Sequence, residues 1–319
     1  MSGFADIDLN VLRGWREEFD AELREDHLLP PLARLVRLDG SQIETIHGPD
    51  VLVGRYHPQH GPVDVILRGL ADHENYRLGA PHLHLSLGDD AVWRLRGVSP
   101  GATTAIDGRL LDHPGERRPI ESGSELTVGQ IRYRFETSGL SLDEWEGART
   151  RLLNRAQGPS LFLCRRGGPC GPHILLNGAG TTLGRSFPDG PLLAGPSSWD
   201  GCSQPDWNLA GLYEDERKFI SFEHARIGMA DDQWQVSPLG ARRKTFVNRL
   251  EVIDATSVSF GDEIALGSVI FYLHEPGDDV APERKALEPP AVIDWQEGST
   301  PILDEASEPS DSGRGRGGE

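Results

Sequence analysis

Four short segments between residues 184 and 267 decide how this chain is interpreted. In order, they read Gly184-Arg185, Ser221-Phe222-Glu223-His224, Thr245-Phe246-Val247-Asn248 and Gly261-Asp262-Glu263-Ile264-Ala265-Leu266-Gly267. Strand-like segments lie between them, which indicates a β-rich domain. The arginine offers a positive charge and the serine a hydroxyl, and a phosphate dianion needs both kinds of group. The set therefore contains the kinds of group that a phosphate-binding site needs.

This ordered set resembles the forkhead-associated (FHA) domain, a β-sandwich that binds phosphothreonine peptides through loops at one end. The resemblance implies that Arg185 and Ser221 hold the phosphate, while other basic residues line the loops. The residues expected to bind the phosphopeptide are Arg185, Ser221, Arg242, Arg243, Lys244 and Thr245. The residues expected to brace the loops are Gly184, His224 and Asn248.

Two positions depart from the pattern of the family. FHA domains commonly carry Asn-Gly-Thr before the last long strands, and the asparagine grips the peptide backbone; here the residues are Arg243, Lys244 and Thr245. The usual glycine after Asn248 is also replaced, by Arg249. Two interpretations stay open: phosphate binding with an altered peptide preference, or an FHA fold that no longer binds phosphate.

The chain contains an internal repeat. Leu52-Val53-Gly54-Arg55 matches Thr182-Leu183-Gly184-Arg185, and the segment 123–129 matches the segment 261–267. The order and spacing of these matches predict two copies of one sandwich.

The first copy looks degenerate. It retains Arg55 and His84, but Pro81 takes the expected place of the serine, and Asp107 takes that of the asparagine. Proline has neither a hydroxyl nor an amide donor, and the aspartate adds negative charge where a phosphate would bind. We therefore expect the first copy to be structural or a phosphate-independent protein-binding surface. Arg55 alone does not restore phosphate binding.

The predicted fold class is all-β, with two FHA-like β-sandwiches, an N-terminal helix, a helical linker and a disordered acidic C-terminal tail. A capping box, Ser141-Leu142-Asp143-Glu144, predicts the start of the linker helix. The expected units are an amphipathic helix over 1–30, a degenerate FHA-like sandwich over 31–138, the helical linker over 139–158, the FHA domain over 159–275 and the tail over 276–319.

Composition narrows the class of partner. The 319 residues carry a formal net charge of −18, which disfavours a nucleic-acid binder, and no apolar run is long enough to predict a membrane span. There is no secretory signal at the amino terminus, and three cysteines make no disulfide framework, so we expect a cytoplasmic protein. Arginine far exceeds lysine, which hints at a GC-rich bacterial genome.

Metal and catalytic interpretations are weaker. Zinc ligands of suitable type are present at Cys164, Cys170, His173 and Cys202, although their spacing is loose. Five histidines also gather in the first copy, at His57, His60, His73, His82 and His84. No nucleophile motif and no phosphate-cradling loop of the nucleotide-binding type occurs. We therefore expect no catalytic residues, no metal and no cofactor.

The sequence thus favours an adaptor or scaffold in serine/threonine kinase signalling that binds a phosphothreonine-containing protein through the second copy. The alternative is a phosphate-independent scaffold or assembly protein that uses both sandwiches for protein contacts. In the tail, Thr300 followed by Leu303 has the spacing that several FHA domains prefer, so phosphorylation of Thr300 is expected to let the tail dock onto the second copy.

Overall fold

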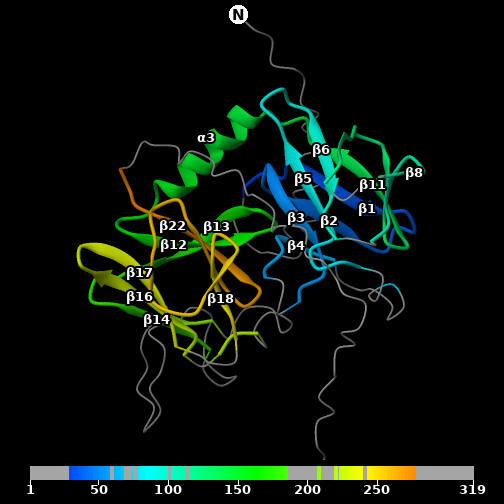
Figure 1. The fold of residues 1–319 in the computed structure, drawn as a ribbon. Coiled ribbons are helices and arrows are strands. Elements are labelled where there is room, and N and C mark those ends of the chain that lie inside the picture. The colour runs from blue at the N-terminus through cyan, green and yellow to red at the C-terminus, as the bar shows by residue number, and fades with distance from the viewer. Residues whose placement is uncertain are drawn as a thin grey trace, which may run out of the picture.

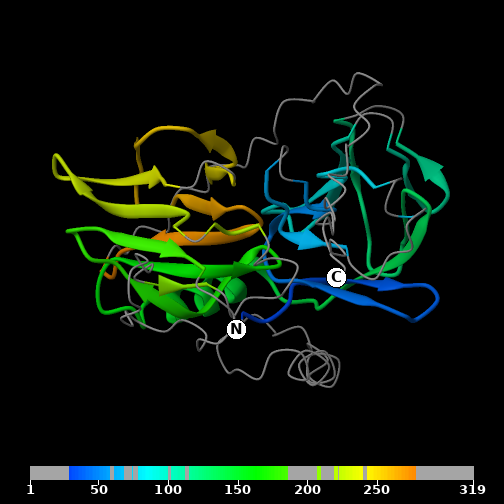
Figure 2. The ribbon, with the colours of Figure 1, turned by 90° about the horizontal axis from the view of Figure 1, so that it is seen from below.

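The computed structural model describes residues 29–57, 61–67, 74, 78–99, 102–111, 115–185, 207–209, 219–221, 223–239 and 243–277. These residues form two β-sandwiches that lie side by side (Figures 1 and 2). The expected helix within residues 1–30 and nearly all of the expected tail, including Thr300, fall outside the described residues.

The first sandwich consists of a six-stranded and a five-stranded sheet. The order across the larger sheet is β2 (Ile43–Ile46), β1 (Ala33–Arg37), β11 (Ile131–Thr137), β10 (Glu125–Val128), β7 (Thr104–Ile106) and β8 (Arg109–Leu110). The order across the smaller sheet is β4 (Val65–Ile66), β3 (Asp50–Gly54), β5 (Leu83–Leu87), β6 (Trp93–Gly97) and β9 (Arg117–Pro119).

The second sandwich also pairs a six-stranded sheet with a five-stranded one. The larger sheet has the order β13 (Gly168–Leu175), β12 (Ser160–Arg165), β22 (Val269–His274), β21 (Glu263–Leu266), β18 (Thr245–Val247) and β19 (Leu250–Val252). The smaller sheet has the order β15 (Trp207–Asn208), β14 (Thr181–Gly184), β16 (Ala225–Ala230), β17 (Gln233–Pro238) and β20 (Thr256–Ser257).

The two sandwiches share one strand order. In the larger sheets, β12 takes the place of β1, β22 that of β11 and β18 that of β7. In the smaller sheets, β14, β16 and β17 take the places of β3, β5 and β6. Even the short parallel pairing recurs, because β3 pairs with β4 as β14 pairs with β15. The repeat seen in the sequence is therefore a repeat of the architecture.

Alternating burial along the strands builds each core. On β11, Ile131, Tyr133 and Phe135 are buried, while the intervening Arg132 and Arg134 are exposed. This period of two places one side-chain set between the sheets and the other in water. The corresponding strand β22 is buried at every position, since its outer face is covered as well as its inner face. A strand buried on both faces indicates that the second sandwich is packed against another layer.

The helix α3 (Leu142–Leu153) forms part of that layer. It begins with the predicted capping box, in which the Ser141 side chain accepts from the Glu144 amide and the Glu144 carboxylate accepts from the Ser141 amide. The Trp145 indole donates to the carbonyl oxygen of His47 in the first sandwich at 2.6 Å, and the guanidinium of Arg149 lies 4.8 Å from the ring centre of Tyr272 in the second. The helix therefore contacts both sandwiches. Within the described part of the chain, no helix has the length and apolar character needed to cross a membrane.

The smaller sheet of the first sandwich faces the second sandwich (Figures 1 and 2). Gly61, in the loop between β3 and β4, lies against the ring of Phe246 on β18. Nearby, the His47 amide donates to the carbonyl oxygen of Arg166 at 2.8 Å. The close approach at that point requires glycine, because a Cβ on Gly48 would overlap the backbone of Gly167. Contacts between the sandwiches thus involve backbone as well as side chains.

Candidate functional site

His224 organises the loops at one end of the second sandwich. It lies just before β16 and is fully buried, with 0% of its surface exposed. Its Nδ1 accepts from the Ser221 amide at 3.1 Å, and its Nε2 lies 3.1 Å from the carbonyl oxygen of Lys244. Burial lowers the pKa of His224 to about 4, so the ring is neutral at pH 7. A neutral ring that accepts at Nδ1 must carry its proton on Nε2, where it donates to Lys244.

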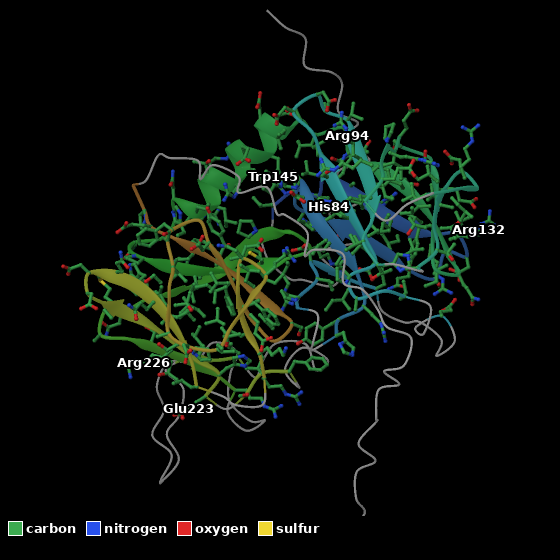
Figure 3. All side chains as sticks on the ribbon, viewed as in Figure 1. His84, Arg94, Arg132, Trp145, Glu223 and Arg226 are labelled. Carbon is green, nitrogen blue, oxygen red and sulfur yellow. The ribbon has the colours of Figure 1, made fainter. Side chains whose placement is uncertain are left out.

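The two hydrogen bonds of the His224 ring form a brace between the loops, and Arg185 and Ser221 meet beside it. The Arg185 amide donates to the carbonyl oxygen of Ser221 at 3.0 Å, immediately after β14 ends. The Ser221 amide donates to His224, and the hydroxyl of this half-buried serine makes no hydrogen bond with the residues that the structure describes. Residues 185 and 221 are far apart in sequence, yet their backbones are bonded at one end of the sheet. Figure 3 marks this end by the label of Glu223, well apart from Arg94 and Arg132 in the first sandwich.

The basic loop before β18 flanks this pair. Arg243 and Lys244 are half-buried, and Arg242 lies outside the described residues. The ammonium of Lys244 is paired with the carboxylate of Glu251 at 2.5 Å. Thr245 differs from the other expected contact residues, because only 1% of its surface is exposed. Its side chain belongs to the interior of β18 and is not presented to a bound peptide.

Asn248 fixes the turn between β18 and β19. Its side-chain oxygen accepts from the Glu263 amide at 3.0 Å, and its side-chain nitrogen donates to Asp262 at 2.8 Å. Its backbone has a positive φ of 47°, a conformation that asparagine tolerates better than most residues. Asn248 thus stabilises the turn through its side-chain hydrogen bonds to Asp262 and Glu263.

The glycine of each Gly-Arg pair lies where a strand meets a loop backbone. In the first sandwich, a Cβ on Gly54 would lie only 2.6 Å from the amide nitrogen of His82 and 2.8 Å from the carbonyl oxygen of Gly79. Gly184 holds the matching place at the end of β14, where its carbonyl accepts from the Leu209 amide at 2.7 Å. The glycine therefore lets the loop pack directly on the strand that aims the arginine.

The register expected for the first copy is wrong by two residues. The residue that corresponds to His224 is His82, not His84, because His82 Nδ1 accepts from the Gly79 amide at 2.9 Å and its Nε2 lies 3.1 Å from the carbonyl oxygen of Thr103. Gly79, rather than Pro81, therefore occupies the position of Ser221. The expected loss of the hydroxyl still holds, since glycine has none.

A serine at position 79 would not fit the first sandwich as it stands. A Cβ there would overlap the side chain of Ser99, whose hydroxyl donates to the carbonyl oxygen of Pro81. His84 has a different role, since its buried ring lies within hydrogen-bonding distance of the carboxylate of Asp50. The first copy thus retains the histidine brace, through His82, and the side chain of Ser99 occupies the space that a serine at position 79 would need.

Asp107 also has a structural role that the sequence did not show. Its carboxylate accepts from the Glu125 amide at 2.8 Å, as the side chain of Asn248 accepts from the Glu263 amide in the second copy. It accepts a second hydrogen bond from the hydroxyl of Ser124 at 3.2 Å. Asp107 therefore fixes the equivalent turn.

The described members of the cysteine and histidine groups form no metal-binding cluster. Cys164 lies on β12 and Cys170 on β13, and Cys202 is outside the described residues. His82 bonds to backbone groups, whereas His84 is directed to a carboxylate. Over the described ranges, no group of three or more His, Cys, Asp or Glu side chains is arranged to hold a metal ion.

Three residues near the loops make contacts between the sandwiches that the sequence did not predict. Tyr56 of the first sandwich packs against Phe219 of the second, with ring centres 4.4 Å apart. Arg249 forms an ion pair with the first sandwich. The presence of Arg249 where the family usually has glycine was a sequence signal for its ion pair. No feature of the sequence predicted the contact of Tyr56 with Phe219.

Comparison with known families identifies the second sandwich. The profile of the FHA domain matches residues 181–267, a range that begins at β14, contains the brace around His224 and ends at the turn after β21. None of the curated proteins with which the chain was compared matches it.

Solved structures of FHA domains resemble part of the chain. The FHA domain of FhaA, complexed with the intracellular domain of Rv3910, is 18% identical, with coverage of 36% of this chain and 99% of that chain and a TM-score of 0.26. The FHA domain of the CT664 protein from Chlamydia trachomatis is 17% identical, with coverage of 37% and 98% and a TM-score of 0.27. The N-terminal FHA domain of S. cerevisiae Rad53p, in complex with a phosphothreonine peptide, is 18% identical, with coverage of 33% and 93% and a TM-score of 0.28. From the family match and the β-sandwich that contains it, the chain carries an FHA domain in its second half.

Proposed function

We propose that the second sandwich binds phosphothreonine-containing peptides, with Arg185 supplying the charge and Ser221 the hydroxyl. The observation that carries this proposal is the Arg185 amide bonded to the Ser221 carbonyl at 3.0 Å, with Ser221 held in turn by His224. This arrangement sets a guanidinium and a hydroxyl on adjacent backbones. Charge-assisted bonds to phosphate oxygens are among the stronger hydrogen bonds that side chains make.

Preorganisation supports the same proposal. The loops are tied to one another through a buried neutral histidine, so little ordering is left for the moment of binding. The Lys244 carbonyl is fixed twice, because it accepts from the Gly267 amide at 3.0 Å and from His224. The basic residues Arg242, Arg243 and Lys244 give this loop a local positive charge, although the chain as a whole has a formal net charge of −18. A phosphopeptide is attracted by the local charge rather than by the total.

At the level of the cell, the proposal makes this protein an adaptor or scaffold in serine/threonine kinase signalling. Its partners are then a protein that carries phosphothreonine and the kinase that modifies it. Such a protein acts by binding and does not need catalytic groups.

A second candidate function belongs to the first sandwich. Gly79 and Asp107 replace the serine and asparagine there, and the space for a serine side chain is taken by Ser99. These features favour a phosphate-independent scaffold surface in the first copy, as opposed to a second phosphate site.

A library of phosphothreonine peptides, tested on the full chain beside the same peptides without phosphate, separates the two functions. A phosphothreonine reader binds members of the first set and fails to bind their unphosphorylated twins. A phosphate-independent scaffold binds neither set or binds both sets alike.

A further inference from the structure

An aromatic pair joins the two sandwiches beside the proposed phosphate site. Tyr56 follows Arg55 in the loop after β3, and its ring meets that of Phe219 in a tilted arrangement, with centres 4.4 Å apart and planes at 58°. Phe219 is only two residues before Ser221. The first sandwich therefore reaches the loop that carries the serine. Aromatic pairs at this separation attract beyond their shared apolar area.

Phe219 is held in place from the other side as well. Its carbonyl oxygen is pressed against Gly267, where an added Cβ would overlap it. Gly267 has a positive φ of 63° in the turn between β21 and β22. The Phe219 backbone thus rests on the second sandwich while its ring rests on Tyr56 of the first, so the ring has a defined position.

Arg243 lies over this ring. Its guanidinium carbon is 5.7 Å from the centre of Phe219, within the range of a cation–π contact. The charge of Arg243 opposes the rise in the pKa of Tyr56 caused by burial, and it adds to the lowering of the pKa of His224. Arg243 is therefore close to both the loop brace and the first sandwich.

Lys244 is paired with Glu251, but among the described residues no carboxylate forms an ion pair with Arg243. A guanidinium that lies over an aromatic ring retains N–H groups that can bind the two oxygens of a carboxylate. The family has an uncharged asparagine at this position, so the arginine changes what the loop can recognise.

We propose that Tyr56, Phe219 and Arg243 form a wall of the peptide-binding site, in which the first sandwich positions Arg243 to bind an acidic side chain close to the phosphothreonine. This proposal rests on the proposed function and deepens it, because it names the class of peptide. Arg243 and Phe219 belong to the second sandwich and Tyr56 to the first, so the site is complete only when both sandwiches are present. Tyr56 is a positioning residue that acts through Phe219.

The test uses the full chain and a series of phosphothreonine peptides with a single glutamate at each of the three positions before and after the phosphothreonine. Each peptide has a twin with glutamine at the same position. At one position, the wild-type chain should bind the glutamate peptide about three- to fivefold more tightly than the glutamine twin, as expected for a half-exposed ion pair. Arg243→Gln should bring the ratio of the two affinities to about one, while the lost positive charge weakens binding of both phosphorylated peptides.

Variants of Tyr56 distinguish positioning from a purely structural role. Tyr56→Phe retains the ring and should keep the glutamate preference. Tyr56→Leu keeps an apolar side chain without the ring, and Tyr56→Ala removes both; these two variants should reduce the preference while thermal unfolding shows that the chain is folded. Arg132→Gln is the matched control, because Arg132 is exposed on β11 far from the loops and pairs with Glu125 (Figure 3). It should change neither the affinity nor the preference.

The outcomes separate this inference from the proposed function. Equal affinity for glutamate and glutamine peptides at all six positions would overturn the inference, and so would a full preference in the folded Tyr56→Leu chain. Neither result affects the binding of phosphate itself. Failure of the wild-type chain to bind any phosphothreonine peptide would overturn the proposed function, and the inference with it.

Discussion

Nη2 of Arg249 in the second sandwich donates to both carboxylate oxygens of Asp64 in the first, at 3.0 and 2.9 Å. The two side chains are only 5% and 2% exposed, and a second carboxylate, that of Glu263, lies 3.3 Å from the same nitrogen. Arg249 has a positive φ of 67°, where the first copy has Gly108 with a φ of 75°. The arginine thus adopts a backbone conformation that favours glycine, and the ion pair between the sandwiches offsets this strain.

Replacement of Asp64 should destabilise the folded chain. Asp64→Asn leaves the buried guanidinium of Arg249 with one carboxylate fewer, which should lower the free energy of unfolding by about 3 kcal/mol. Urea unfolding of the variant and the wild type measures this loss. Glu125→Gln breaks an exposed ion pair with Arg132 and serves as the control, with an expected loss below about 1 kcal/mol. Similar losses in the two variants would contradict a stabilising role for the buried pair.

The effects of Arg249 and Asp64 should not add. Arg249→Gly relieves the strained backbone but leaves Asp64 buried without its main cation. Asp64→Asn keeps the strained backbone and leaves the buried Arg249 without its main carboxylate. The double variant lacks the strain and the unpaired Asp64 charge, and only Glu263 is left without its cation, so it should lose less stability than the sum of the two single losses, by at least about 1 kcal/mol. A double-mutant cycle from urea unfolding gives this coupling. Strict additivity would show that the two residues act independently.

Stability should fall when the pH drops from 7 to 5. Burial lowers the pKa of both His82 and His224 to about 4, from the ordinary value of 6.5. The unfolded chain therefore binds protons that the folded chain does not, so this contribution is complete above pH 6.5 and is lost as the pH falls toward 4. Between pH 6.5 and 5, each histidine accounts for about 2 kcal/mol. Urea unfolding at pH 7 and at pH 5 checks the direction and size.

A histidine variant assigns the pH effect. His224→Gln is less stable at pH 7 because it breaks the loop brace, but its stability should depend less on pH, by about 2 kcal/mol between pH 7 and 5. If the pH dependence of this variant equalled that of the wild type, other groups would be responsible.

A serine introduced at the degenerate position should be poorly tolerated. Gly79→Ser places a side chain against Ser99, so the free energy of unfolding should fall by about 1 to 3 kcal/mol. Adding Ser99→Gly removes the overlapping side chain and should recover part of the loss, while the carbonyl oxygen of Pro81 still lies 2.8 Å from the added Cβ. Thermal unfolding of the single and double variants checks both effects. No recovery in the double variant would mean that Ser99 is not what excludes the serine.

The sequence predicted the local parts of this structure well. Repeated Gly-Arg segments and the capping box at Ser141 each depend on residues close together in the chain, and the predicted repeat and the predicted start of the helix are both confirmed. The register of the first copy was missed because His82 and His84 are two residues apart and no serine is present to choose between them. The two histidines are distinguished only by their hydrogen-bond partners, which are backbone groups for His82 and the Asp50 carboxylate for His84.

Contacts between the sandwiches were beyond the reach of the sequence pattern. Asp64 and Arg249, like Tyr56 and Phe219, meet only after two separate sandwiches have formed and packed. These residues belong to no periodic sequence pattern, because each contact depends on how the two sandwiches are oriented relative to each other. The buried state of Thr245 was missed for another reason: on β18 it shares the inner face with Val247, which belongs to the core of the second sandwich, whereas Phe246 points to the opposite face.

We propose above that Arg185 and Ser221 bind the phosphate of a phosphothreonine peptide. Titration calorimetry of the full chain and of Arg185→Ala, each against the tightest library peptide and its unphosphorylated twin, tests it most directly. The wild type should bind only the phosphorylated peptide, and Arg185→Ala should lose about 2 to 5 kcal/mol of binding free energy while it remains folded. Equal binding of both peptides by the wild type, or unchanged affinity in folded Arg185→Ala, would contradict the claim.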